Sequence, residues 1–459
     1  MCRPLSAYFS IFIIIPMSEK SSLKIGFIGL GVVGQGVWKH IHRHGEALRT
    51  RLGVGIELHK AAVRDLSRPR LPEIPISALC EDPHSIVGDP EIDIVCELMG
   101  GTELAKELTL KAFANGKTVV TANKALICEH GTELFEAAQK NGAHYFFEAS
   151  VAGGIPVIKA LREGLVANQF PHIFGILNGT SNYMLTRMER EGIAYEDVLD
   201  EARNLGYVEA DEALDLDGVD AAHKAAILAY LAYGRWVALD DMVVEGIREV
   251  SLIDIEAARR LGCKIKLLAI IEKNFETHRI RVGVHPMLIN SDEVVARVDE
   301  VFNAVSITGD VVGNTILIGR GAGQDATASA VISDVVDAVE SILNGDSAAL
   351  LRQEQAFYNR ISDGSSIASL DEIEGSYYLR LSVQDKPGVL AKVTDILANG
   401  QISISTVEQS TNPESDSANL ILTTHKTTEK AMADAVKSLS RESSVLHKPV
   451  LMRIFEKPE

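Results

Sequence analysis

The sequence predicts an α/β fold that begins with a Rossmann-type, doubly wound parallel sheet. Three observations support this prediction. Short apolar runs alternate with helical segments over residues 22–150. The run Ile92–Leu98 is almost wholly apolar, as expected for a strand that helices cover on both faces. A glycine-rich turn follows the first of these runs and opens the first helix.

The expected elements of this domain follow one another in a regular order. Strands are expected at Leu23–Ile28, Ile56–Val63, Ile92–Leu98, Thr118–Thr121 and His144–Glu148, and helices at Gln35–His44, Leu104–Asn115 and Gly131–Asn141. The middle helix should end at Gly116, because glycine readily adopts the left-handed conformation that closes a helix. Crossovers between parallel strands are right-handed, so we expect the ligand at the carboxyl ends of the strands.

Gly29, Gly31 and Gly34 form the pattern G-x-G-x-x-G directly after the first strand. The first glycine permits a tight turn, the second lets a pyrophosphate approach the backbone, and the third lets the helix pack close to the strand. Val32 and Val33 would place backbone N–H groups at the helix N-terminus, facing the pyrophosphate. In this context the pattern predicts a nicotinamide dinucleotide site, the alternative being a glycine turn without a ligand.

The end of the second strand bears on which dinucleotide binds. Arg64 could pair with a 2′-phosphate, which favours NADP. Asp65 could instead bind the ribose 2′-OH of NAD, and Arg64 could equally be a solvated surface residue. The sequence therefore favours NADP and leaves NAD possible.

Composition narrows the class of protein. The 459 residues allow two to four domains at roughly 100–200 residues each. A net charge of −18, from 45 basic and 63 acidic residues, argues against a nucleic-acid binder, which needs a basic face. The five cysteines are odd in number and include no C-x-x-C pair, which indicates the reducing cytoplasm rather than a disulfide scaffold or a zinc site.

Residues 1–21 are expected to lie outside the fold. The apolar run Ile11–Ile15 is far shorter than the ~20 residues that span a bilayer. No small-residue cleavage site follows it, and Pro16 interrupts it. We expect residues 1–16 to be disordered or an upstream mis-start before Met17, with a targeting segment as the alternative, and we expect no membrane association.

From residue 151 to about 320 the pattern changes to an α+β unit that we expect to carry catalysis and dimerisation. Its expected strands are Ile173–Leu177, Lys264–Ile271 and Arg281–His285, and its expected helices are Tyr195–Leu205, Asp220–Tyr233 and Asp254–Leu261. A glycine-rich turn at 319–323 then precedes a helix expected over Asp325–Leu343. This segment, about 321–345, should pack back on the first domain.

Two lysines occupy positions that suit hydride-transfer chemistry, which needs a group to give or take a hydroxyl proton. Lys124 follows a sheet strand, where a doubly wound fold places its ligand. Lys224 lies one turn after Asp220 on an Ala- and Leu-rich helix, and burial would lower its pKa toward the range useful for proton transfer. An exposed ion pair between Asp220 and Lys224 is the alternative.

An acidic stretch precedes that helix. It contains Glu209, Asp211, Asp215 and Asp217. These carboxylates could hold a substrate ammonium group or could simply form a solvated loop.

Several ordered blocks over about residues 22–345 together resemble the homoserine dehydrogenase family. They are the glycine turn, Glu97–Gly101, Thr121–Lys124, Glu148–Pro156, Asn178–Tyr183, Leu205–Asp211, Asp217–Lys224, Glu245–Ile247 and Gly321–Ala328. The resemblance implies NAD(P)-dependent interconversion of L-homoserine and L-aspartate 4-semialdehyde, a step toward threonine and methionine. It implies that Lys224 gives the proton to the aldehyde oxygen and that Asp220 orients Lys224.

The resemblance also implies the remaining site residues. For the substrate they are Glu209 at the ammonium group, Asp215 as a second candidate, Lys124, Thr180 and Tyr207. For the cofactor they are Lys124, Gly100, Gly206 and Gly323, beside the glycine turn. A monovalent cation, usually sodium, would be held by Glu148 and by the backbone carbonyls of Val151, Gly153 and Ile155.

The C-terminal residues 377–459 restart a β-α-β pattern after a polar stretch, 346–376, that we expect to be a linker. Leu379–Val383 is an expected strand, Asp385–Gly388 a loop, and a helix to about Ala398 precedes a strand at Ile402–Ile404. This pattern resembles an ACT domain, a βαββαβ module that binds amino acids, although an extra Gln401 departs from it.

The resemblance to an ACT domain implies feedback inhibition by L-threonine and a homodimer or homotetramer. The alternative is a dimerisation module without a ligand.

Two other functions deserve comparison. An aspartate-semialdehyde dehydrogenase needs a cysteine nucleophile with a nearby base, and neither Cys96 nor Cys128 has such a neighbourhood in the sequence. A non-catalytic sensor of a dinucleotide and an amino acid would have no need of both Lys224 and Glu209.

Overall fold

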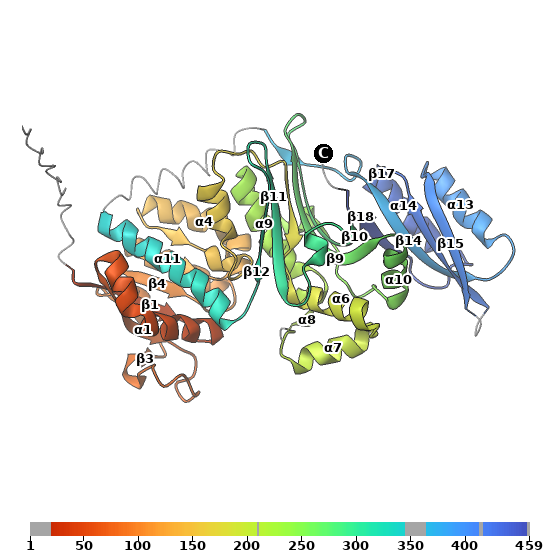
Figure 1. The fold of residues 1–459 in the computed structure, drawn as a ribbon. Coiled ribbons are helices and arrows are strands. Elements are labelled where there is room, and N and C mark those ends of the chain that lie inside the picture. The colour runs from red at the N-terminus through yellow and green to blue at the C-terminus, as the bar shows by residue number, and fades with distance from the viewer. Residues whose placement is uncertain (1–19, 209–210, 345–363, 413–415, 457–459) are drawn as a thin grey trace, which may run out of the picture.

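The computed structural model describes residues 20–208, 211–344, 364–412 and 416–456. The expectations for residues 1–16 and for Glu209 lie outside these ranges. Figure 1 shows two sheet-containing bodies side by side, with the C-terminal unit at the far end of the second. Within the described part, no helix is long and apolar enough to span a membrane.

The first body contains the predicted parallel, doubly wound sheet, in the order β3-β2-β1-β4-β5-β6. Its strands are β1 (Ser22–Ile28), β2 (Gly55–Ala62), β3 (Leu79–Cys80), β4 (Ile94–Glu97), β5 (Thr118–Thr121) and β6 (Tyr145–Phe146). The chain runs outward from β1 in one direction and from β4 in the other, so the strand order reverses between these two strands. A doubly wound sheet binds its ligand at such a reversal.

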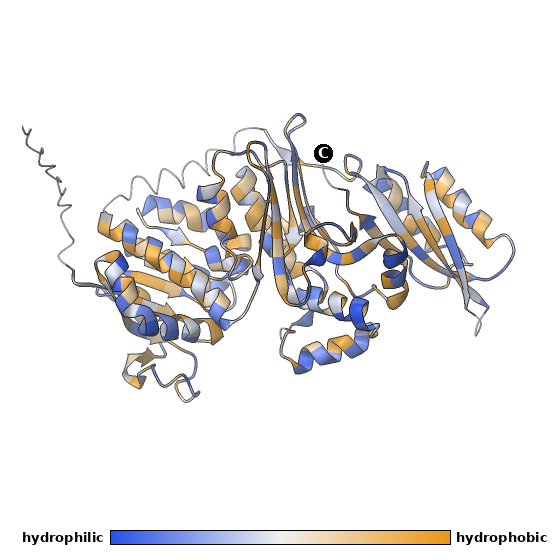
Figure 2. Cartoon of the chain, in the orientation of Figure 1, coloured by the Kyte–Doolittle hydropathy of each residue, from blue (hydrophilic) through white to orange (hydrophobic). Residues whose placement is uncertain are grey.

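Helices cover both faces of this sheet. On one face lie α1 (Val32–Leu52) and α11 (Gln324–Asn344), which pack on each other and on β1. On the other lie α2 (His84–Val87), α3 (Glu103–Ala114) and α4 (Lys124–Lys140). Figure 2 shows that these helices carry both hydrophobic and hydrophilic residues, as expected for helices with one covered and one exposed side.

Two helices begin earlier than their sequence patterns indicate. The helix expected from Gln35 begins at Val32, immediately after the glycine turn. The helix expected from Gly131 begins at Lys124, because the Asn123 side chain accepts a hydrogen bond from the Leu126 amide and caps it. This second difference places Lys124 in the first turn of a helix.

The second body is built on a mixed sheet in the order β12-β11-β7-β9-β10, with short β8 (Val243–Val244) beside β10. Its long strands are β7 (His172–Ile176), β9 (Cys263–Asn274), β10 (Arg279–Asn290), β11 (Phe302–Gly309) and β12 (Gly313–Arg320). The β11–β12 hairpin was not among the elements expected from the sequence. After Pro156 the chain forms only the short helix α5 (Val157–Lys159) and a π turn.

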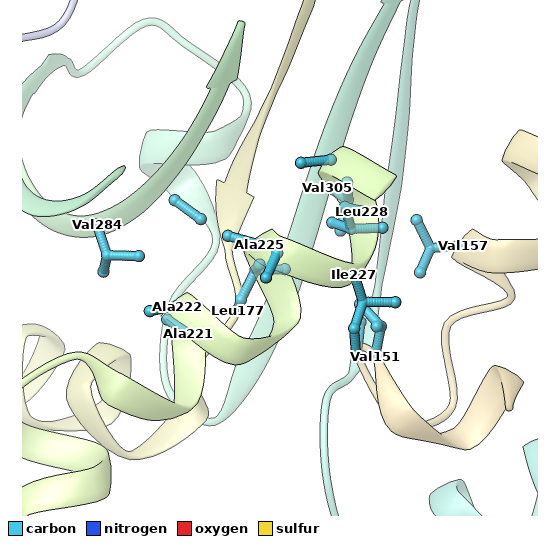
Figure 3. Close-up of a cluster of buried hydrophobic side chains, with 14 of the residues drawn as sticks. Val151, Val157, Leu177, Ala221, Ala222, Ala225, Ile227, Leu228, Val284 and Val305 are labelled. Atoms are coloured by element: carbon cyan, nitrogen blue, oxygen red, sulfur yellow. The ribbon is translucent and has the colours of Figure 1, made fainter. Parts of the chain in front are cut away.

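The helices of this body are α6 (Gly179–Glu191), α7 (Tyr195–Asn204), α8 (Glu212–Leu216), α9 (Val219–Tyr233) and α10 (Leu252–Arg260). Helix α9 is buried along almost its whole length. In Figure 3, Ile227 of α9 lies on the side of Val151 and Val157, whereas Ala222 lies on the side of Val284. The helix therefore links the end of the first domain to the sheet of the second.

The C-terminal unit continues the same sheet. Its elements are β14 (Glu374–Gln384), α13 (Val389–Asn399), β15 (Ile404–Asn412), β16 (Ser417–Thr424), β17 (Thr427–Thr428), α14 (Glu429–Leu439) and β18 (Val450–Ile454). Strand β18 pairs with β14 on one side and with β10 on the other. Within the stretch expected to be a linker, β13 (Ser366–Ile367) also pairs with β10.

Candidate active site

A cavity of about 440 Å³ lies at the carboxyl ends of β1, β2 and β4. The turn Gly29–Gly31 forms one wall, Arg64 and Asp65 form a second, and Met99 and Gly100 form a third. The cavity therefore occupies the point at which the strand order reverses, as predicted for the dinucleotide.

Each of the three glycines of the turn is suited to its position for a different structural reason. Gly29 has a φ of +94°, and a Cβ there would meet the Leu98 carbonyl oxygen at 2.7 Å. A Cβ at Gly34 would meet the carbonyl oxygen of Gly29 at 2.7 Å, so α1 packs very close to β1. A Cβ at Gly31 would meet no atom of the described chain within 4 Å. The space in front of Gly31 thus fits a pyrophosphate held at the helix N-terminus.

Three arginines, Arg64, Arg68 and Arg70, line the end of the cavity beside β2. The Oδ1 atom of Asp65 accepts hydrogen bonds from the Ser67 amide and hydroxyl at 2.8 and 2.6 Å. That carboxylate oxygen is therefore engaged within its own turn, while the arginines offer the cationic surroundings that a 2′-phosphate needs.

Glu97, fully buried at the end of β4, links this cavity to the next strand. Its carboxyl accepts hydrogen bonds from the Met99 amide at 3.0 Å and from the Thr121 hydroxyl at 2.7 Å. Burial raises the pKa of Glu97 to about 7. Asn123 extends the link, since its side-chain amide donates to the Gly101 carbonyl at 2.8 Å. The loop that lines the cavity and the start of α4 are thereby held together.

Lys224, Asp220 and Lys124 meet where the two bodies face each other. Lys224 Nζ donates to Asp220 Oδ2 at 2.7 Å and to the Leu177 carbonyl at 2.7 Å. Lys124 Nζ lies 3.1 Å from Asp220 Oδ1. Asp220 and Lys224 are both buried, so they form a buried ion pair, and the alternative of an exposed ion pair is wrong. Burial opposes ionisation of Asp220, but the two ammonium groups hold the pKa of its carboxyl well below the usual range.

Asn178, the N-cap of α6, holds this cluster from the second body. Its Nδ2 atom donates to Asp220 Oδ2 at 2.9 Å and to Asp215 Oδ1 at 2.8 Å. Its Oδ1 atom accepts from the Ser181 amide at 2.8 Å, which fixes the side-chain orientation. Asp215 is buried rather than part of a solvated loop.

The remaining predicted residues lie around this cluster or apart from it. The Thr180 hydroxyl donates to the Tyr207 carbonyl at 2.7 Å, which joins α6 to the loop after α7. Gly206 in that loop and Gly323 before α11 both have left-handed φ values, +71° and +113°, with open space at the Cβ position. Arg64 lines the cavity beside β2, away from the lysine cluster.

The segment predicted to hold a cation contains a buried carboxylate and a tight backbone turn. The Glu148 carboxylate accepts from the amides of Ile158 and Lys159 at 2.9 and 2.7 Å, and burial raises its pKa to about 7. Ala152 and Gly153 both have left-handed φ values, +55° and +52°, and form a tight turn. Such donors fit a hard cation in kind. Within the described ranges no group of three or more His, Cys, Asp or Glu side chains could hold a metal.

Three residues of the site had no role assigned from the sequence. Asn178, Asn123 and Glu97 all lie in the blocks that resemble the family, but nothing in their spacing shows which groups they contact. Their residue types and positions could have indicated these roles. Asn is a favoured N-cap residue, and a Glu in an otherwise apolar strand is seldom buried without partners.

The arrangement defines a class of protein. A cavity lies where the strand order of a doubly wound sheet reverses, and Asn123 bonds the loop beside it. The next residue, Lys124, reaches Asp220, which together with the Leu177 carbonyl holds the buried Lys224. This combination supports hydride transfer coupled to proton transfer, as in a nicotinamide-dependent oxidoreductase.

Comparisons with known proteins agree with this class and identify the family. Models of "Homoserine dehydrogenase, NAD binding domain", "Homoserine dehydrogenase" and "ACT domain" match residues 29–148, 156–336 and 377–443. The homoserine dehydrogenase of Pseudomonas aeruginosa is 42% identical over 435 residues, which cover 94% of this chain and 98% of that protein. That of Helicobacter pylori is 41% identical, with 95% and 99% covered.

Solved structures give the same result. The crystal structure of a homoserine dehydrogenase from Thiobacillus denitrificans has a TM-score of 0.85 at 40% identity, covering 95% of this chain and 98% of that one. A hyperthermophilic archaeal homoserine dehydrogenase in complex with NADPH has a TM-score of 0.59 at 28% identity, covering 70% and 98%. The chain belongs to the homoserine dehydrogenase family, with a C-terminal ACT domain, and is an oxidoreductase with an NAD(P)-binding domain.

Replacing Gly31 with valine should block the dinucleotide without disturbing the fold. The backbone φ of Gly31 is −77°, which any residue adopts, and the added side chain would enter the open space in front of it. We expect NADP affinity to fall by roughly 100-fold or more, because the pyrophosphate must approach this backbone closely. Calorimetric titration measures the affinity.

Gly45→Val is the control for adding a valine side chain in this region, because Gly45 lies within α1, with open space at its Cβ, whereas Gly31 is the residue that caps α1. It should keep full NADP affinity. Normal NADP binding by Gly31→Val would refute the assignment of the cavity.

Proposed function

We propose that this protein interconverts L-homoserine and L-aspartate 4-semialdehyde with NADP as the preferred cofactor. The observation that carries the proposal is the buried cluster in which Asp220 binds Lys224 and Lys124 at once. The cluster joins the cofactor-binding body to the substrate-binding body. A nicotinamide ring and a small aldehyde can therefore meet beside one proton donor.

Lys224 is the acid–base group of the reaction. In the reducing direction its ammonium gives a proton to the aldehyde oxygen, and in the oxidising direction its neutral amine takes the hydroxyl proton. Bound NADPH supplies the hydride that adds to the aldehyde carbon. Asp220 and the Leu177 carbonyl hold Nζ in place, so no reorientation is needed at the moment of proton transfer.

The amino-acid end of the substrate requires anionic and polar partners. We assign its ammonium group to Glu209, which lies outside the described residues, with Asp215 as the second candidate. Thr180 and Tyr207 line the pocket, and Lys124 contacts both substrate and cofactor. The bond between Thr180 and the Tyr207 carbonyl keeps the loop that leads to Glu209 beside α6.

Preference for NADP over NAD rests on the three arginines beside β2. They lie where the adenosine ribose of a dinucleotide is held in this fold, and Arg64 is the candidate for direct pairing with the 2′-phosphate. Asp65 is the group that would favour NAD, but one of its oxygens is already bonded to Ser67.

A sodium ion would bind at the turn after β6. Its ligands would be the carbonyls of Val151, Gly153 and Ile155, with Glu148 nearby. The left-handed turn packs tightly on the glycine-rich loop before α11, since a Cβ at Gly153 would meet the Gly321 carbonyl oxygen at 2.4 Å. A cation there would stabilise the junction between the two bodies.

The ACT domain would bind L-threonine at the loop after β14. A cavity of about 390 Å³ is lined there by Asp385, Lys386, Gly388 and Gln409. A carboxylate, an ammonium and backbone at a helix start suit the charged groups of an amino acid.

The assembly is expected to be a homodimer or homotetramer. The edge strand β12 and the turn before it expose Val311, Val312 and Ile318, a surface that a second copy of the chain would cover. We place the enzyme in the cytoplasm, where unpaired cysteines such as Cys80, Cys96, Cys128 and Cys263 are stable.

The purified protein should reduce NADP, and NAD less efficiently, when L-homoserine is added. Lys224→Met should lower kcat by about 100- to 10,000-fold, the usual contribution of one acid–base group, and should leave NADP binding unchanged. Absorbance at the reduced-nicotinamide band measures turnover.

Lys266→Met is the matched control for the loss of a buried lysine. Lys266 is also buried, and it is bonded to Asp299 at 3.0 Å and to a backbone carbonyl at 2.8 Å, but in the sheet core. The folded fraction of the Lys266→Met protein should keep normal turnover. Normal turnover by Lys224→Met would remove Lys224 from the chemistry, and a wild type that leaves homoserine unoxidised would support the sensor alternative.

Millimolar L-threonine should inhibit homoserine oxidation and raise the Tm of the protein. Asp385→Ala should remove both effects and keep basal activity, because Asp385 lies far along the chain in the regulatory unit. If threonine neither inhibits the wild type nor shifts its Tm, the ACT domain serves dimerisation without this ligand.

A further inference from the structure

The segment Glu245–Ile247, called the strap below, is a motif that the proposed chemistry leaves unused. It follows β8 and lies between the catalytic sheet and the ACT domain. The Glu245 amide donates to the Val284 carbonyl of β10 at 2.8 Å. The Ile247 amide donates to the Leu216 carbonyl at the end of α8 at 2.9 Å. The strap is thus bonded to the sheet at one end and to α8 at the other.

Arg453 of β18, in the ACT domain, binds the strap. It is buried, and its guanidinium donates to both carboxylate oxygens of Glu245. The same guanidinium donates to both carboxylate oxygens of Glu429, at the start of α14. Glu429 also accepts from the Tyr377 hydroxyl at 3.0 Å. Paired bonds of this kind fix direction as well as distance.

The ion cluster is the firm contact in this part of the junction. A cavity of about 570 Å³ adjoins it, lined by Arg248 and Val250 on the catalytic side and by Lys448 and Val450 on the regulatory side. Because the two sides leave this space between them, the bonds from Arg453 to Glu245, rather than close packing, hold the strap on the side that faces this space. A shift of Arg453 is therefore passed to the strap through Glu245.

At its other end the backbone of the strap packs directly on the end of α8. A Cβ at Gly246 would lie 1.9 Å from the Leu216 carbonyl oxygen and 2.4 Å from the Asp217 Cα. Arg248, directly after the strap, pairs with Asp217 at 2.5 Å. With no flexible side chain between them, a displacement of the strap must displace the end of α8.

The end of α8 bears directly on the catalytic pair. The Asp215 carbonyl accepts from the Ser181 hydroxyl at 2.8 Å, and its carboxylate accepts from Asn178 at 2.8 Å. The same Asn178 amide group donates to Asp220, which orients Lys224. Asn178 therefore has one partner that the strap can move and one that must stay fixed for catalysis.

We propose that Glu245 and Arg453 are positioning residues for Lys224, and that the ACT domain acts on turnover through the strap, α8 and Asn178. The inference rests on the proposed function of Lys224 and Asp220. It adds a specific route between the regulatory and catalytic domains, made of contiguous contacts whose coupling can be measured.

A second ion cluster across the same junction provides a matched comparison. Asp254, fully buried at the start of α10, accepts from the Tyr378 hydroxyl at 2.9 Å and from Arg380 Nε at 2.7 Å. Arg380 also donates to the Glu249 carbonyl close to the strap, so Asp254 is the better residue to change. Glu245→Gln and Asp254→Asn each remove one negative charge paired with an ACT-domain arginine.

Glu245→Gln should lower kcat for homoserine oxidation by about tenfold and leave KM for NADP within about twofold, because a misplaced proton donor slows chemistry without altering the cofactor cavity. Arg453→Lys, which keeps the charge and loses the paired geometry, should do the same. Asp254→Asn should keep kcat within about twofold at an equal or larger loss of Tm, because a purely structural role moves Tm alone.

A double-mutant comparison tests the route itself. In an Asn178→Ala background, Glu245→Gln should lower kcat by less than about twofold, because the link through which it acts is already absent. The wild-type assay tests the proposed reaction separately. The proposal would be overturned if Glu245→Gln and Asp254→Asn lost kcat equally, or if Glu245→Gln and Arg453→Lys both kept full activity. It would also be overturned if Glu245→Gln lowered kcat as strongly in the Asn178→Ala background as in the wild type.

Discussion

The buried carboxylate of Asp220 is the constraint on which the site depends. An ionised carboxylate removed from water costs several kcal/mol unless charges and hydrogen bonds compensate it. Here Lys224 on the same helix and Lys124 on the cofactor-binding body both do so. The ion cluster therefore spans two domains, and its geometry sets how the cofactor-binding body meets the body that carries Lys224.

The surrounding elements can be understood as supports for this cluster. Asn123 starts α4 and bonds the cofactor loop, so Lys124 and the dinucleotide cavity share one anchor. Asn178 starts α6 and bonds both Asp215 and Asp220, so the second body has an anchor of the same kind. In both cases a helix N-cap performs a second task, because its amide donates to the site while its oxygen caps the helix.

The features that the sequence predicted are those determined by patterns among residues close together in the chain. The glycine turn, the alternation of strands and helices, and the spacing of Asp220 and Lys224 are local, and all are present in the structure. Three other features depend on tertiary packing, which no periodic pattern in the sequence encodes. They are the contact between Lys124 and Asp220, the burial of Glu97, and the position of the strap. The β11–β12 hairpin was missed for a related reason, since its outer strand is largely exposed and lacks a continuous apolar run.

The most direct test of the central claim is the turnover of Asp220→Asn, measured as kcat for homoserine oxidation with NADP at saturation. Asparagine keeps the shape and the bond to Lys224 but removes the charge that two lysines share. We expect kcat to fall by about 100-fold or more while the NADP dissociation constant is unchanged. A kcat within about twofold of the wild type would contradict it.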